Sequence, residues 1–118
     1  NQGGFAKMSQ LWKPETVVNF AEFVTYAEGS IVSKTLMDKP AGSLTLFAIA
    51  KGQGISEHKS PYDATVQVIE GEGSFQVAEN VYKVKAGEGL VMPANIPHAV
   101  LPGEGFKMLL IMIRSKNE

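Results

Sequence analysis

Short runs rich in β-favouring residues, many of them alternating between apolar and polar positions, make up the chain from residue 31 onward, and glycine or proline punctuates them. The runs cover 31–37, 43–50, 55–59, 64–70, 74–79, 81–85, 89–93, 98–101 and 106–114. A period of two is typical of a strand that has one buried face. Strands at this spacing predict an all-β sandwich or barrel, because βαβ units need a helical crossover of a dozen or more residues.

The segments between these runs have the composition of turns. Gly71 and Gly73 flank Glu72 and predict a tight hairpin, because glycine accepts the positive φ that such turns require. Glu79–Asn80 and the segment 86–89 predict two more turns. The three Gly-Glu-Gly triplets do not indicate phosphate binding, since a phosphate loop needs a helix directly after it.

The segment 15–29 carries a mixed pattern. Val17, Phe20 and Val24 fit a helical stripe, whereas the many β-branched residues favour a strand. We expect a short strand or one helical turn, ended by Gly29.

The chain has the length of one domain, at 118 residues. Residues 1–7 resemble a remnant of an expression vector, with Met8 as the native start. We therefore expect an N-terminal segment, 8–30, that packs on a β-barrel formed by 31–118.

The last run, 106–114, is apolar on both faces. One face carries Phe106, Met108, Leu110 and Met112, and the other carries Leu109, Ile111 and Ile113. A sheet with one wet face shows polar residues at every second position, and here only Lys107 interrupts the pattern. We expect the N-terminal segment to cover part of the outer face, through Trp12 and Phe23. A second chain is expected to cover the rest, which predicts a homodimer about a two-fold axis.

Composition narrows the possible partners and location. The formal net charge of -1 gives no basic footprint for nucleic acid, and no apolar run approaches the roughly 20 residues that span a membrane. The chain contains no cysteine, which favours a reducing, cytoplasmic location and excludes zinc–thiolate sites.

The two histidines of the chain lie in two glycine-rich segments, 52-GQGISEHKSPYDATVQVIEGEG-73 and 87-GEGLVMPANIPHAV-100. These segments resemble the two signature motifs of the cupin superfamily, whose members are small double-stranded β-helix, or jelly-roll, barrels. The second motif is matched by Gly87, Glu88, Pro93, Pro97 and His98. The resemblance implies an all-β cupin barrel.

The first motif departs from the family pattern. Members that bind a metal use two histidines and a glutamate of the first motif and the histidine of the second. Placing Gly71 on the family's hairpin glycine puts His58 at the first position, Ser60 at the second and Ala64 at that of the glutamate, while His98 fills the last. Two of four ligands are therefore replaced. The resemblance implies at most a weakly bound divalent transition metal, with Asp63 as the nearest substitute carboxylate and Glu57 behind it.

Three functions remain open at this point. The leading expectation is a small organic ligand in the barrel lumen, in a pocket lined by His58, Ser60, Tyr62, Ala64, Met92 and His98. The first alternative is a metal-dependent enzyme of the dioxygenase or isomerase type that uses His58, His98 and Asp63. The second is a structural or regulatory cupin without a ligand. In the plainer interpretation, Asp63 is a turn residue after Pro61 and the methionines fill the core.

Overall fold

The structure is a computed structural model that describes residues 11–114, so the expected remnant 1–7 and Met8 lie outside the described residues. It contains one helical turn, α2 (Phe20–Phe23), followed by strands β1 (Ile31–Lys39), β2 (Gly42–Ile49), β3 (Ile55–His58), β4 (Asp63–Val77), β5 (Asn80–Lys85), β6 (Gly89–Met92), β7 (His98–Leu101) and β8 (Phe106–Ile113). The expected all-β class is confirmed. Within this described part, no helix is long and apolar enough to cross a membrane.

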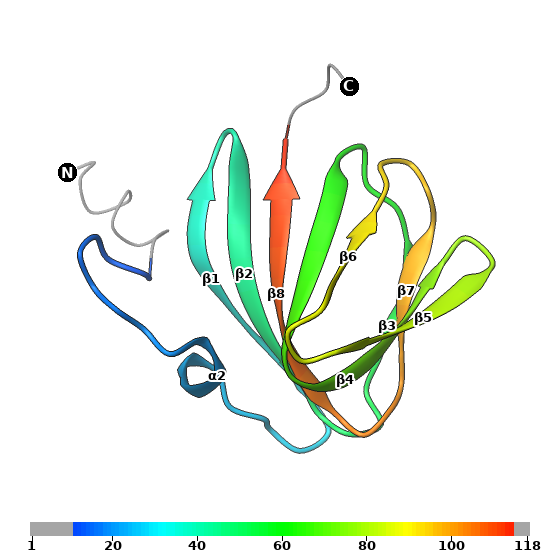
Figure 1. The fold of residues 1–118 in the computed structure, drawn as a ribbon, viewed down its shortest axis with the longest axis horizontal. Helices are drawn as coiled ribbons and strands as arrows, with labels where there is room; N and C mark the ends of the chain where they lie inside the picture. Colours follow the sequence, from blue (N-terminus) through cyan, green and yellow to red (C-terminus); the bar gives the residue numbers. More distant parts are fainter. Residues whose placement is uncertain (1–10, 115–118) are drawn as a thin grey trace.

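The strands form one curled antiparallel sheet in the order β1-β2-β8-β4-β7-β3, with β5 and β6 also paired to β4 (Figure 1). The long strand β4 divides this sheet into two layers. Its first part pairs with β8 and β6, and its last part pairs with β5 and β7. We call the layer of β1, β2, β8, β6 and the start of β4 the first layer, and the remainder the second layer. The space between them is the lumen.

The predicted hairpin at Gly71–Gly73 is wrong, because β4 runs through it without a turn. Phe106 of β8 explains why these positions are glycine. A Cβ on Gly73 would lie 2.6 Å from the Phe106 ring, and one on Gly71 would lie 3.1 Å from the Phe106 Cβ. The glycines therefore let Phe106 cross β4 where the strand passes between layers, and Gly71 adopts a φ of 80° there.

The lumen is filled at its deep end by apolar side chains. The inward alternation expected for β4 is confirmed, since Ala64, Val66 and Val68 are buried. The rings of Phe75 and Phe106 meet edge to face with centroids 5.7 Å apart. The cluster is completed by Ile49, Val84, Met92, Val100 and Met108. Such packing leaves the deep end as a core, not a ligand cavity.

The N-terminal segment forms one helical turn and no strand, which corrects the first of the two expectations for 15–29. The Asn19 side chain caps the turn by accepting a hydrogen bond from the Glu22 backbone N–H, at 3.1 Å. Val24 is buried, but Val17 is 98% exposed and does not join the predicted stripe. The aromatic residues of the segment turn instead toward the outer face of the first layer.

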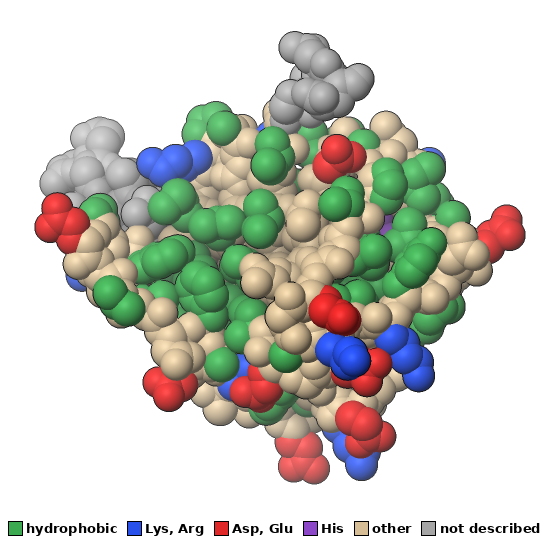
Figure 2. Space-filling model, viewed as in Figure 1, with side chains coloured by type: hydrophobic (Ala, Val, Ile, Leu, Met, Phe, Trp, Pro, Cys, Tyr) green, Lys and Arg blue, Asp and Glu red, His purple; other side chains and the backbone are tan. Residues whose placement is uncertain are grey.

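That outer face forms a second apolar cluster. Its buried members are Val24, Leu36, Leu46, Ala48 and Leu109, and Trp12, Phe20, Phe23 and Ile111 pack against them. The Trp12 and Phe20 rings meet at 5.3 Å. Figure 2 shows hydrophobic side chains gathered beside the N-terminal segment, with charged side chains concentrated toward the lower edge of the view. The chain itself therefore supplies cover for Leu109, while Ile113 at the strand end remains 58% exposed.

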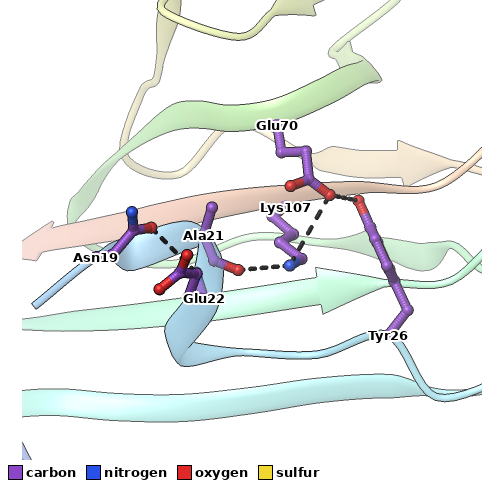
Figure 3. A network of polar contacts seen from close by, with 6 residues as sticks. All are labelled: Asn19, Ala21, Glu22, Tyr26, Glu70 and Lys107. Atoms are coloured by element: carbon purple, nitrogen blue, oxygen red, sulfur yellow. Dashed lines mark hydrogen bonds and ion pairs between the residues drawn. The ribbon is translucent and has the colours of Figure 1, made fainter.

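A polar cluster fastens the N-terminal segment to this face (Figure 3). The ammonium group of Lys107, whose residue is 8% exposed, donates to the carbonyl of Ala21 and lies 3.8 Å from the Glu70 carboxylate. It also lies 5.0 Å from the centroid of the Tyr26 ring. The Tyr26 hydroxyl donates to the same carboxylate oxygen at 2.8 Å. Burial, together with the hydrogen bond to Glu70, raises the pKa of Tyr26 well above its ordinary value.

Candidate functional site

The structure brings His58 and His98 together on neighbouring strands. They are directly opposed between β3 and β7, and their ring centroids lie 4.4 Å apart at an interplanar angle of 69°. His98 shares a strand face with Val100, which belongs to the lumen core. Both rings therefore belong to the lumen side of the second layer. An irregularity between Ile55 and His58 shifts the register, and it makes this pairing possible.

Both imidazole rings are oriented by backbone carbonyl groups. The Nδ1 atom of His58 lies 2.8 Å from the carbonyl oxygen of Ser56, and that of His98 lies 3.1 Å from the carbonyl oxygen of Ile96. A carbonyl oxygen can only accept, so Nδ1 must carry the proton in each neutral ring. The Nε2 atom of each ring is left with a lone pair, and it has no hydrogen-bond partner among residues 11–114.

The two rings differ in burial. His98 is 5% exposed, whereas His58 is exposed. No buried side-chain nitrogen or oxygen of the described residues lacks a partner, so the unpartnered Nε2 of His98 must reach solvent. Burial lowers the pKa of His98, the bond to Ile96 opposes this shift, and the charge of a protonated His58 adds to it. The pair thus combines one buried ring with one exposed ring.

The other expected pocket residues have structural partners. The Ser60 hydroxyl accepts from the Tyr62 backbone N–H at 3.0 Å and lies 3.3 Å from the Tyr62 carbonyl, which closes the bend before β4. Ala64 and Met92 are buried opposite each other in the core. One carboxylate oxygen of Asp63 accepts from the Ala94 backbone N–H at 2.8 Å. Asp63 therefore holds the turn that precedes His98.

A metal centre does not fit this set of residues. Among residues 11–114, no group of three or more His, Asp or Glu side chains is arranged to hold a metal ion. Asp63 is engaged in its turn, and Ser60 and Ala64 supply no imidazole or carboxylate. Two histidines offer fewer ligands than the three that a catalytic zinc ordinarily takes from protein. The expected triad of His58, His98 and Asp63 is not assembled.

Sequence reasoning missed the carbonyl groups of Ser56 and Ile96, which orient the rings. Each carbonyl comes from the residue two positions before its histidine. A carbonyl group is present at every position, so residue identity gives no signal for this role. Only the bend at Pro93–Pro97, where Asn95 adopts a φ of 64°, could have indicated an unusual backbone near His98.

Two hollows can be described among residues 11–114. One, of about 390 Å³, lies along β3 and β7 and is lined by Gly54, Ile55, Ser56, Glu57, Gln76, Ala99, Val100, Leu101 and Pro102. The other, of about 480 Å³, is lined by Tyr26, Glu28, Gly29, Ala50, Lys51 and Glu104. Neither lining includes His58 or His98. These hollows are the alternatives against which a site at the pair must be tested.

The curled antiparallel sheet with a histidine from each motif defines a cupin-type double-stranded β-helix. Residues 45–114 match the family model described as Cupin domain, and the chain belongs to this family. No curated protein matches the sequence.

Solved structures agree with this assignment. A conserved protein of unknown function from Streptococcus pyogenes is 33% identical, with a TM-score of 0.82, over 87% of this chain and 90% of that chain. A Cupin 2 conserved barrel domain protein from Leptotrichia buccalis is 49% identical, with a TM-score of 0.77, over 80% of this chain and 46% of that chain. A cupin superfamily protein from Desulfitobacterium hafniense is 23% identical, with a TM-score of 0.82 over 88% and 95% of the two chains, which is a likeness of fold alone.

Proposed function

We propose that this cupin binds a small organic molecule at the open end of its lumen, beside His58 and His98. The observation that carries the proposal is the pair of rings whose Nε2 lone pairs have no partner in the described chain. Folded proteins satisfy nearly all polar groups within the chain or with water. Two oriented, unpaired acceptors at one opening are therefore suited to receive a ligand.

The packing of the lumen supports the location. The deep end is closed by the core around Phe75 and Phe106. Leu90, Leu110 and Met112 are only partly buried against that core, and they supply apolar walls. Apolar walls with a few directed polar groups are typical of small-molecule sites.

The family supports binding in the barrel but does not supply a reaction, since one fold serves many activities. The Streptococcus pyogenes relative is itself described as a protein of unknown function. A metal-dependent reaction at His58, His98 and Asp63 lacks a third ligand. We keep the cytoplasmic location and the homodimer as proposals, the first from the absence of cysteine and the second from the outer face of β8.

A thermal-shift screen of small metabolites against the whole chain tests the proposal. A bound ligand stabilises the folded chain by RT ln(1 + [L]/Kd), so it raises the unfolding temperature. We expect His58→Phe, which keeps a ring against His98 but removes the lone pair, to abolish the shift. The control is Gln76→Met, which changes a polar side chain in the hollow along β3 and β7. A shift that survives His58→Phe but disappears in Gln76→Met would place the ligand in that hollow and refute the proposal.

A further inference from the structure

The histidine pair has a hydrogen-bonding character that restricts what it can bind. In each neutral ring the Nδ1–H group donates to a backbone carbonyl group, that of Ser56 for His58 and that of Ile96 for His98. Both therefore present only an acceptor, Nε2, to a bound molecule. The nearby Ser60 hydroxyl is engaged with Tyr62 in the bend before β4. The opening thus offers two acceptors and no donor from these three side chains.

Ionised ligand groups suit this arrangement poorly. A carboxylate or phosphate oxygen would face two lone pairs unless Nε2 took up a proton, and the burial of His98 opposes that protonation. An ammonium group would find acceptors, but no Asp or Glu of the described residues joins the two histidines as a possible counter-charge. Desolvating a cation without such a partner is costly. A neutral hydroxyl group meets neither penalty.

We propose that the site selects neutral, hydroxyl-bearing molecules, such as polyols and sugars, over their carboxylate counterparts. Two hydroxyl groups of one ligand donate to Nε2 of His58 and Nε2 of His98. This inference rests on the proposed function, because it names the class of ligand for the same opening. One neutral hydrogen bond contributes a factor of about 2 to 10 in affinity, so the preference over a matched acid is expected to be roughly tenfold or more.

Nitrogen-15 NMR of the imidazole rings in the whole, unliganded chain tests the basis of the inference. In the neutral form of each ring we expect the proton on Nδ1, with an unprotonated Nε2. His58→Gln and His98→Gln, each examined alone, assign the resonances. A proton on Nε2 of either neutral ring would overturn the inference, whatever ligand is later found.

Paired titrations, followed on the same resonances, test the selectivity. The probes are glycerol against glycerate, ribose against ribonate, and glucose against gluconate. We expect at least one neutral member to perturb both rings, and its acid to bind at least roughly tenfold more weakly. Tighter binding of the acids at the histidines would leave the proposed function standing and refute the inference. If no probe perturbs either ring while a hit from the metabolite screen does, and that hit is anionic, the inference fails as well. If neither the probes nor any screened compound perturbs the rings, both proposals fail.

Discussion

Polar groups lie both on the outer face of the first layer and at the histidine pair on the lumen side of the second layer, but the two sets differ in how completely they are hydrogen-bonded. On the outer face, Lys107 is surrounded by the Ala21 carbonyl, the Glu70 carboxylate and the Tyr26 ring. At the lumen opening, each histidine satisfies one ring nitrogen and leaves the other unpaired. The groups around Lys107 are paired with one another, whereas each histidine keeps one ring nitrogen without a partner in the described chain.

The difference separates a structural polar cluster from a binding site. Lys107 donates to a carbonyl of the N-terminal segment and so holds that segment on the sheet. The histidine rings are oriented by backbone carbonyl groups, and their Nε2 atoms have no hydrogen-bond partner among the described residues. Removing one member of a partnered, buried charge cluster destabilises the fold, because the remaining members are left without their partner. Acceptors that are oriented but unfilled are available for a ligand.

Removal of the Lys107 ammonium is expected to have the largest effect on stability. Lys107→Met keeps most of the length of the side chain but removes the donor to the Ala21 carbonyl and the positive charge beside Glu70. We expect a loss of about 2 kcal/mol in the free energy of unfolding, measured with urea. Lys51→Met is the matched control, because Lys51 pairs with Glu104 at an exposed site, and its loss should stay below about 0.5 kcal/mol. Equal losses in the two variants would contradict the structural role of the cluster.

The second prediction asks whether another chain completes the outer face. Ile113 is 58% exposed and Val91 is 55% exposed, while Leu109 is already covered. We expect a homodimer in solution, and Ile113→Glu should reduce its mass to that of the monomer in light scattering. Ile113 is preferred to Ile111 for this test, because Ile111 packs against the second apolar cluster and its substitution would also disturb that packing. Val17→Glu, at a fully exposed valine of the N-terminal segment, should leave the dimer intact. A wild-type chain that is monomeric, or an Ile113→Glu variant that is still dimeric, would count against this surface.

The third prediction concerns pH at the lumen opening. Burial lowers the pKa of His98 in the folded state below its ordinary value of about 6.5. The unfolded chain therefore binds this proton more readily, so the stabilising contribution is complete above about pH 6.5 and is lost as the pH falls through the lowered pKa. His98→Gln should remove this dependence, so the stability difference between wild type and variant should change as the pH falls below about 6.5. A constant difference across that range would show that His98 is not buried as described.

The smallest expected effect is that of metal removal. Since two histidines form an incomplete ligand set, any divalent transition metal should be held weakly and below one per chain. Dialysis against a chelator should leave the unfolding temperature unchanged. One tightly held metal per chain after purification without an affinity tag would contradict the description of the site.

Much of this fold could be predicted from the sequence, because alternation reports which face of a strand is buried. The inward set Ala64, Val66 and Val68 is confirmed, and so is the all-β cupin barrel. The prediction of a hairpin at Gly71–Gly73 is wrong, because glycine is used both in tight turns and where another part of the chain approaches the backbone closely. Here it admits the Phe106 ring, and the partner lies far along the chain. Local composition does not distinguish these two uses.

The candidate site was predictable only in part. The motif spacing indicated His58 and His98, and the structure places their rings side by side. The motif spacing did not indicate that the Asp63 carboxylate accepts a hydrogen bond from the Ala94 backbone N–H, since this bond joins residues far apart in sequence. Nor did it indicate the protonated nitrogen of each ring, which depends on carbonyl groups that every residue possesses.

A crystal structure of the chain, grown with the compound that gives the largest thermal shift, tests the central claim most directly. We expect the ligand at the open end of the lumen, with a donor group within hydrogen-bonding distance of Nε2 of both His58 and His98. The Nδ1 contacts to Ser56 and Ile96 should be unchanged. A ligand in the hollow lined by Gln76 and Pro102, or in the lumen without contact to either Nε2, would contradict it.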